Sequence, residues 1–440
     1  MSPTTIGMLM FAGMLAMMAL RVPIAAAMFI PGALGYMALT SDTGLLSLLK
    51  GSSVARMSIY DLSVIPLFLL MGQFATQGGL SRALFKAAAA FVGHIRGGLA
   101  MAAVMSAAAF GAVCGSSVAT SATITQVAYP EMKAHGYHGR LSTGTLAVGG
   151  TLGILIPPSV PLVVYAILTE QNIAKLFAAA MVPGLLAMAG YMIVIAIVCR
   201  VNPGLAEPME PATWAERGRA LLGVWPILTI FIVVFGGIYG GIFSPTEGAA
   251  VGALATLVAG VAQGELGLKA IERCFVGAAE TAAMVFMIFL GADMMNSALA
   301  LTQMPAALAA WMTTLTIPPI LIIAAILVLF VVLGCVMDEL SMLLLTIPVL
   351  FPAVMGMDLW GLGAEDKAIW FGILVLMVVG VGLVAPPVGL NVYVVNSLAK
   401  EVPMNETYKG VMPFLASDLI RTVLLLFFPA ICLGLIKLLM

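Results

Sequence analysis

The sequence predicts an all-α polytopic membrane protein with two similar halves, each containing a re-entrant helical hairpin and a helix broken at a Pro-Pro pair. Three observations lead to this prediction. Of the 440 residues, 62% are hydrophobic and 9% are charged, whereas soluble proteins carry about 25% charged residues. Long uncharged runs recur along the chain, and the motif Gly-x-x-x-Pro-Pro occurs once in each half.

Uncharged apolar runs predict membrane-spanning helices. About 20 apolar residues in a helix cross the hydrocarbon core of a bilayer. A count along this chain gives roughly ten to twelve such segments, some broken by Gly or Pro. The clearest runs are residues 177–199, 221–242, 318–337 and 422–436. The net charge of −1 offers no basic patch for nucleic acid.

More polar stretches divide the chain. Residues 200–219 predict a loop outside the membrane near the midpoint. Residues 80–92 and 263–273 predict short amphipathic helices at the membrane interface. We therefore expect N-terminal scaffold helices in 1–60, a first repeat of arm helix, hairpin and broken helix in 61–200, a central loop with scaffold helices in 201–262, and a second repeat with a C-terminal helix in 263–440.

Four short matches, in the same order in both halves, indicate an internal duplication. The offset between matched residues stays between 222 and 230. The matched pairs are Pro130 with Pro352, Gly153 with Gly382, Val164 with Val392, and Pro183 with Pro413.

Each Pro-Pro pair must break a membrane helix, because proline lacks an amide hydrogen and clashes with the preceding turn. The freed backbone groups are tolerated only where the backbone is buried in protein or lines a wet cavity. Paired breaks in matching halves point to a transporter binding site, where carbonyls can ligate Na⁺. Residues 111–123 and 334–341, upstream of the breaks, predict hairpin tips. Taken singly, each stretch fits close helix packing or a simple kink equally well.

A series of motifs, from about residue 20 to the C-terminus, resembles a known family. Taken together and in order, they are similar to the large membrane subunit of TRAP (tripartite ATP-independent periplasmic) transporters, in the ion transporter superfamily. The motifs are Gly-Ser-Ser-Val-Ala-Thr at 115–120, Pro-Glu-Met at 130–132, Gly-Ile-Leu-Ile-Pro-Pro-Ser-Val-Pro at 153–161, Phe-Ser-Pro-Thr-Glu at 243–247, and Ala-Pro-Pro-Val-Gly-Leu-Asn at 385–391.

This resemblance implies a sodium-driven, elevator-type importer of an organic acid, with inverted structural repeats, in the inner membrane of a bacterium. The partners that it implies are a periplasmic substrate-binding protein and a small four-helix membrane subunit in the same bilayer. An alternative is a self-sufficient sodium/carboxylate symporter of the same superfamily. A membrane-embedded enzyme is disfavoured, because the sequence shows no His-Glu-x-x-His motif, paired aspartates or Ser-Lys or Ser-His pair of the kind such enzymes use.

The resemblance also implies positions for the ligands. Na⁺, the coupling ion, would occupy two or more sites, and the organic acid would bind between them. The first sodium site would involve Ser116, Ser117, Gly153, Ile156 and Pro158. The second would involve Gly334, Asp338, Gly382, Ala385 and Pro387. The substrate would lie near Ser116, Thr151, Ser159 and Asn391.

Charged residues at the second tip have more than one interpretation. Asp338 is either a sodium ligand or the N-cap of the following helix. Glu339 is either a supporting group or an interface residue. Before the second Pro-Pro pair, the family pattern leads us to expect a glutamate where this chain has Gly380. A charge-based role at that point is therefore in doubt.

Overall fold

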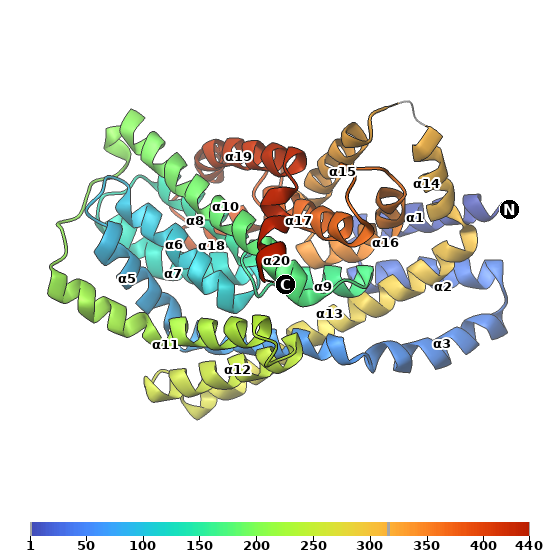
Figure 1. The fold of residues 1–440 in the computed structure, drawn as a ribbon, viewed down its shortest axis with the longest axis horizontal. Helices are drawn as coiled ribbons and strands as arrows, with labels where there is room; N and C mark the ends of the chain where they lie inside the picture. The colour runs from blue at the N-terminus through green and yellow to red at the C-terminus, as the bar shows by residue number, and fades with distance from the viewer. Residues whose placement is uncertain (1, 315–316, 440) are drawn as a thin grey trace.

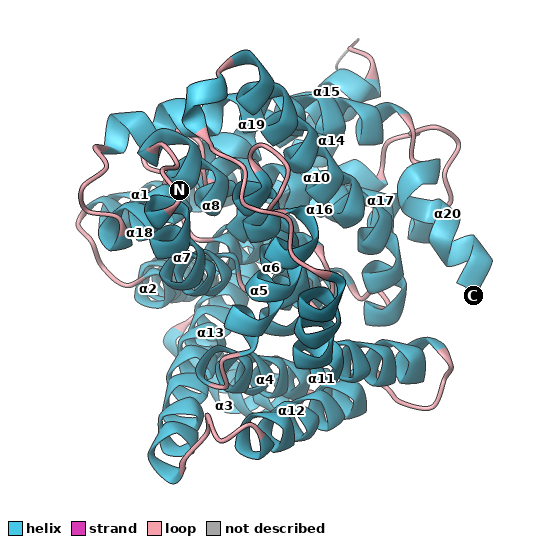
Figure 2. Ribbon diagram, turned by 90° about the vertical axis from the view of Figure 1, so that its left-hand side faces the viewer, coloured by secondary structure: helices cyan, strands magenta, loops and turns pink. Residues whose placement is uncertain are grey.

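The computed structural model describes residues 2–314 and 317–439, and throughout those residues it contains helices and no strand (Figure 2). Within this described part, five helices are long and apolar enough to cross a membrane. Two further helix pairs, each bent at a short break, raise the number to seven if each pair is one span. The predicted all-helical fold is therefore confirmed.

The helices fall into an outer and an inner group. In Figure 2, α3, α4, α11 and α12 lie together in a layer on one side of the molecule. The long helix α13 packs against α2 and α4. The outer group comprises α1 (Pro3–Ala19), α2 (Ile24–Leu39), α3 (Asp42–Met57), η1 (Tyr60–Ser63), α4 (Val64–Gln77), α5 (Leu80–Val92), α11 (Trp214–Tyr239), α12 (Pro245–Ala262), α13 (Leu268–Thr302) and α14 (Met304–Thr314).

The inner group contains the predicted hairpins and broken helices. Figure 1 shows α6, α7 and α8 on one side of the molecule and α15, α16 and α17 on the other. The inner elements are α6 (Gly98–Cys114), α7 (Ser117–Ala134), α8 (Gly139–Leu155), α9 (Val160–Thr169), α10 (Ile173–Val201), α15 (Pro319–Gly334), α16 (Glu339–Met355), α17 (Ala364–Gly382), α18 (Leu390–Leu398), α19 (Met404–Phe427) and α20 (Ala430–Leu439), with η2 (Pro203–Leu205) in the central loop.

The first hairpin turns where the sequence predicted a tip. Helix α6 ends at Gly115, whose φ of +67° is a left-handed conformation that favours glycine. Ser116 then caps α7 by accepting a hydrogen bond from the amide of Ala119. After this hairpin, α8 and α9 are bent by 41° at the Pro157-Pro158 pair. The second hairpin, α15–α16, turns at residues 335–338 and is followed by the break between α17 and α18.

The two halves exchange their second half-helices. Helix α9, from the first half, packs against α16 of the second hairpin, whereas α18 packs against α7 and α8. Two buried hydrogen bonds fasten the exchange. The Tyr165 hydroxyl donates to the Ala368 carbonyl at 2.6 Å, and the Asn391 amide donates to Ser117 Oγ at 2.7 Å. The two hairpins and broken helices therefore form one interlocked unit.

Two local expectations are wrong. Residues 263–273 do not form a separate amphipathic helix, because α13 begins at Leu268 and continues for 35 residues. The apolar face of its first turns joins a much longer membrane helix. The run 422–436 is also not one helix, because Pro429 separates α19 from α20. By contrast, the predicted arm helix over 80–92 is present as α5.

Glycine-to-glycine crossings hold each hairpin against its broken helix. A methyl group on Gly382 would lie 2.7 Å from Gly334 Cα, and a methyl group on Gly111 would lie 2.5 Å from Gly153 Cα. Both neighbours are backbone atoms, so neither can rotate aside. The helices can approach this closely only without side chains at these positions.

We expect Gly382→Ala to lower the free energy of unfolding by about 1–3 kcal/mol through overpacking. The measurement is the thermal transition of the purified protein. Gly236→Ala is the matched control, because Gly236 lies inside α11 with no atom near its added methyl group within 4 Å. Equal transition temperatures for Gly382→Ala and the unmodified protein would contradict the close crossing.

Candidate ion and substrate site

Each hairpin tip accepts a hydrogen bond from a residue that follows the helix break of its own half. The amide of Val160, which begins α9, donates to the Gly115 carbonyl at 3.3 Å. The amide of Gly389, which precedes α18, donates to the Cys335 carbonyl at 3.3 Å. One backbone amide freed by each break is thus satisfied by a tip. The same local arrangement occurs in both halves.

The first of these junctions is rich in buried oxygens. A methyl group on Gly153 would lie 2.6 Å from Thr120 Oγ1 and 2.9 Å from the Ser116 carbonyl oxygen, so both oxygens border this glycine. Thr120 and Ser121 are fully buried. Within the described part of the chain, their hydroxyl oxygens have no hydrogen-bond partner. Buried polar atoms normally have partners, so this gap needs an explanation such as an ion.

Predicted sodium residues of the first set meet at this junction. Ser116 and Gly153 are neighbours, and the Pro158 carbonyl oxygen lies 3.0 Å from the position of a methyl group on Gly115. Ser117 Oγ instead accepts the hydrogen bond from Asn391. Ile156 is buried, and its amide donates to the Leu152 carbonyl.

Three of the four predicted substrate residues lie around the same place, whereas the Thr151 hydroxyl faces Tyr191. Ser116 and Ser159 are the N-caps of α7 and α9. The Asn391 amide also donates to the Ala147 carbonyl at 3.3 Å, while Asn391 Oδ1 has no partner among the described residues. Thr151, Ser159 and Asn391 are at most 1% exposed. Ser116 is partly exposed, so this place is only partly shielded from solvent.

The second junction has fewer free oxygens. Asp338 is the N-cap of α16, and its carboxylate accepts from both the amide and the hydroxyl of Ser341. The Pro387 carbonyl accepts from the Tyr408 hydroxyl at 3.0 Å. Gly334 and Gly382 are in contact, and Ala385 directs its amide to the Val381 carbonyl. The N-cap interpretation of Asp338 is confirmed, whereas its sodium role stays a prediction.

Glu339 points inward, although the sequence predicted only a supporting or interface role for it. Its side chain is 6% exposed, and its carboxylate lies close to the backbone of Ser117 at the opposite tip. Its Oε2 atom has no hydrogen-bond partner in the described structure.

A buried polar network supports the first broken helix. Thr151 Oγ1 lies 3.1 Å from the Tyr191 hydroxyl, which donates to Asp418 at 3.0 Å. Asp418 pairs with Arg421 at 2.5 Å. Gly380 lies beside Thr151, because a methyl group added to Gly380 would lie 3.4 Å from Thr151 Cβ. This chain therefore lacks a charge at position 380, but Thr151 beside it is linked through Tyr191 to the buried Asp418–Arg421 pair.

Several of these residues were not singled out by sequence reasoning. Thr120 lies four residues after Ser116, so both share one helix face, and that spacing could have identified it. Arg421 and Asp418 are one helical turn apart in an apolar helix, which is a recognisable signal for a buried pair. Tyr191 gave no such signal, because only the fold brings it to Thr151.

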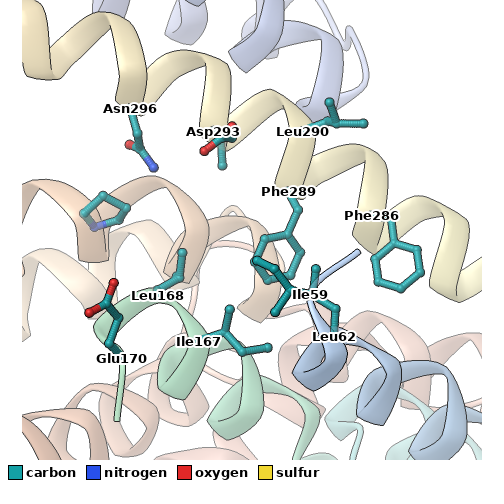
Figure 3. A pocket seen from close by; sticks show the side chains of 12 residues that line it. Ile59, Leu62, Ile167, Leu168, Glu170, Phe286, Phe289, Leu290, Asp293 and Asn296 are labelled. Atoms are coloured by element: carbon teal, nitrogen blue, oxygen red, sulfur yellow. The ribbon is translucent and has the colours of Figure 1, made fainter. Parts of the chain in front are cut away.

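A separate cavity of about 210 Å³ lies between the outer helix α13 and the inner helix α9. Figure 3 shows Asp293 and Asn296 on α13 facing this space, with Glu170 and Leu168 at the end of α9 across from them. Its lining contains none of the predicted substrate residues. The cavity marks the boundary between the outer and inner groups and not the candidate site.

We expect Asp418→Leu to cost about 3–5 kcal/mol of stability, because it leaves the Arg421 guanidinium buried without its partner. The double variant Asp418→Leu/Arg421→Met removes both charges and should recover most of that loss. Thermal unfolding of the purified protein checks both values. If Asp418→Leu unfolds like the unmodified protein, the buried pair does not support α8 and α10.

Comparisons with known proteins agree with this architecture. The family model for the DctM component of tripartite ATP-independent periplasmic transporters matches residues 11–431. The C4-dicarboxylate TRAP transporter large permease protein DctM of Pseudomonas aeruginosa is 34% identical over 86% of each chain. The ectoine TRAP transporter large permease protein TeaC of Halomonas elongata is 30% identical over 97% of each chain.

Two further likenesses extend the comparison. The sialic acid TRAP transporter large permease protein SiaM of Vibrio cholerae is 28% identical over 90% of this chain and 91% of its own. The crystal structure of the YdaH transporter of Alcanivorax borkumensis has the same fold, with a TM-score of 0.63, 16% identity, and coverage of 89% of this chain and 90% of that one. The chain therefore belongs to the DctM family of tripartite ATP-independent periplasmic transporters, as a membrane permease and not an enzyme.

Proposed function

We propose that this chain imports an organic carboxylate across the bacterial inner membrane, driven by Na⁺, as the large subunit of a binding-protein-dependent system. A periplasmic substrate-binding protein would deliver the substrate, and a small four-helix membrane subunit would complete the complex. Relatives named for C4-dicarboxylate and sialic acid transport support an organic acid as the substrate.

The observation that carries the sodium proposal is a pair of buried oxygens at the first junction. Thr120 Oγ1 has no partner among the described residues, and the Ser116 carbonyl oxygen accepts from the Thr120 amide. Thr120 Oγ1 and the Ser116 carbonyl oxygen border Gly153, where the broken helix begins to unwind. Hard cations prefer oxygen ligands, and unwound transporter helices supply carbonyls to Na⁺. Both oxygens are uncharged and belong to groups that do not titrate, which favours Na⁺ over a proton as the coupling ion.

Two helix N-termini support binding of a carboxylate. Helices α7 and α9 begin side by side, because the amide of Val160 donates to the Gly115 carbonyl. Their N-caps, Ser116 and Ser159, lie next to the predicted sodium residues. The positive ends of both helix dipoles therefore converge on one place, and such ends stabilise anions.

The exchanged half-helices support movement of the inner group as one body. Because α9 packs on the second hairpin and α18 on the first helix pair, neither half can shift alone without breaking the hydrogen bonds of Tyr165 and Asn391. In the elevator mechanism that we propose, the inner group would carry the site past the outer helices. The inverted relation of the two halves belongs to this proposal.

We expect uptake of labelled organic acid into proteoliposomes, with the binding protein present, to require an inward Na⁺ gradient. Thr120→Val should raise the Na⁺ concentration for half-maximal uptake about tenfold, equivalent to ~1.4 kcal/mol of lost ion binding. The matched control is Thr256→Val, a buried threonine in the outer helix α12 whose hydroxyl already donates to the Gly252 carbonyl.

Two outcomes would contradict the proposal. Uptake that persists without Na⁺ and follows a proton gradient would remove the sodium coupling. Uptake that is equally fast without the binding protein would instead favour the self-sufficient symporter.

A further inference from the structure

The second hairpin tip places a carboxylate inside the protein against the first tip. Glu339 is the first residue of α16 and is 6% exposed. Its carboxylate lies close to the backbone of Ser117, the first residue of α7. The side chain therefore bridges the gap between the two hairpins, where the proposed substrate would bind.

Asn391, which also contacts Ser117, carries a second buried acceptor without a partner. Asn391 donates its amide hydrogens to Ser117 Oγ and the Ala147 carbonyl, which leaves Oδ1 as its free group. Asn391 Oδ1 and Glu339 Oε2 are both buried and have no partner among the described residues. When Glu339 is ionised, both atoms can accept hydrogen bonds but cannot donate them. The backbone amides of Ser117 and of Glu339 itself face the Glu339 carboxylate, but Glu339 Oε2 and Asn391 Oδ1 still lack a donor.

No described cation neutralises Glu339. The ion pairs among the residues that the structure describes join Lys133 to Glu401, Lys175 to Glu365, Lys409 to Glu406, and Arg421 to Asp418. A buried carboxylate without a counter-charge is strongly unfavourable. A cation bound between the two tips would supply the missing charge during transport.

We propose that Glu339 recognises a cationic nitrogen on the substrate, which makes the substrate a zwitterionic organic acid. This inference rests on the proposed function. The substrate carboxylate would face the N-termini of α7 and α9, and its ammonium or amidinium group would face Glu339 and Asn391. A dicarboxylate in the same position would place a second negative charge beside Glu339.

The donor pattern favours a nitrogen cation over Na⁺ at this place. An ammonium or amidinium group donates several N–H bonds and can satisfy the free oxygens of both Glu339 and Asn391. Sodium donates nothing and needs a shell of oxygens. The oxygens suited to that shell lie at Ser116 and Thr120, around Gly153.

The test uses the full-length permease, purified with its small subunit in a fixed Na⁺ concentration. The thermal transition is measured against the concentration of two matched pairs of probes, succinate with β-alanine and glutarate with 4-aminobutyrate. Within each pair, one carboxylate of the first probe is replaced by an ammonium group in the second. We expect an ammonium-bearing probe to stabilise the protein at about tenfold lower concentration than its dicarboxylate match.

The isosteric variant Glu339→Gln should abolish this preference while it still folds. Glu207→Gln, at an exposed acid of the central loop, is the control and should keep the preference. A dicarboxylate preference in the unmodified protein, no stabilisation by either ammonium probe at millimolar concentration, or an unchanged preference in Glu339→Gln would each overturn the proposal.

A sodium titration without any probe tests the remaining explanation, that Glu339 is a sodium ligand. If Glu339→Gln shifts the Na⁺ midpoint about tenfold in that titration, Glu339 is a sodium ligand and the proposal fails. Loss of sodium-coupled uptake would remove the proposed function, but it would leave the probe preference as a separate result. The two failures are therefore distinguishable.

Discussion

The structure depends on the need to satisfy the backbone groups that two Pro-Pro pairs set free inside a membrane protein. Water is absent from the bilayer core, so each freed group needs a protein partner or an ion. The hairpin tips supply the partners, with Gly115 accepting from Val160 and Cys335 accepting from Gly389. These contacts require close approach, which the glycine pairs at 111 with 153 and 334 with 382 permit. The breaks therefore require the hairpin tips, and the tips can reach the breaks only because of these glycines.

The two junctions obey this constraint unequally. At the first, Thr120 and Ser121 retain buried hydroxyls without partners. At the second, the Asp338 carboxylate accepts a hydrogen bond from the Ser341 hydroxyl, and the Pro387 carbonyl accepts one from the Tyr408 hydroxyl. The first junction is therefore the better candidate for an ion. The exchange of α9 and α18 couples the two, because Asn391 of the second break bonds to Ser117 of the first tip.

The sequence alone predicted the elements that local chemistry determines. Two prolines after a glycine break a helix wherever they occur, and a Gly-Ser pair can end one helix and cap the next, so the breaks and the first tip were predictable. The contacts that cross between halves were not, because no local pattern places Tyr191 beside Thr151 or α9 beside α16. The same limit explains Glu339: its inward direction depends on how the two tips meet. Residues 263–273 misled because the polar start of a long helix resembles a short interfacial one.

The central claim is that the gap beside Gly153 holds the coupling ion. Its most direct measurement is a pair of experimental structures of the permease, one in Na⁺ and one with choline in place of Na⁺. Our account predicts density within coordination distance of the Ser116 carbonyl and Thr120 Oγ1 in Na⁺, and its loss in choline. Identical density in both conditions, or none in either, would contradict it.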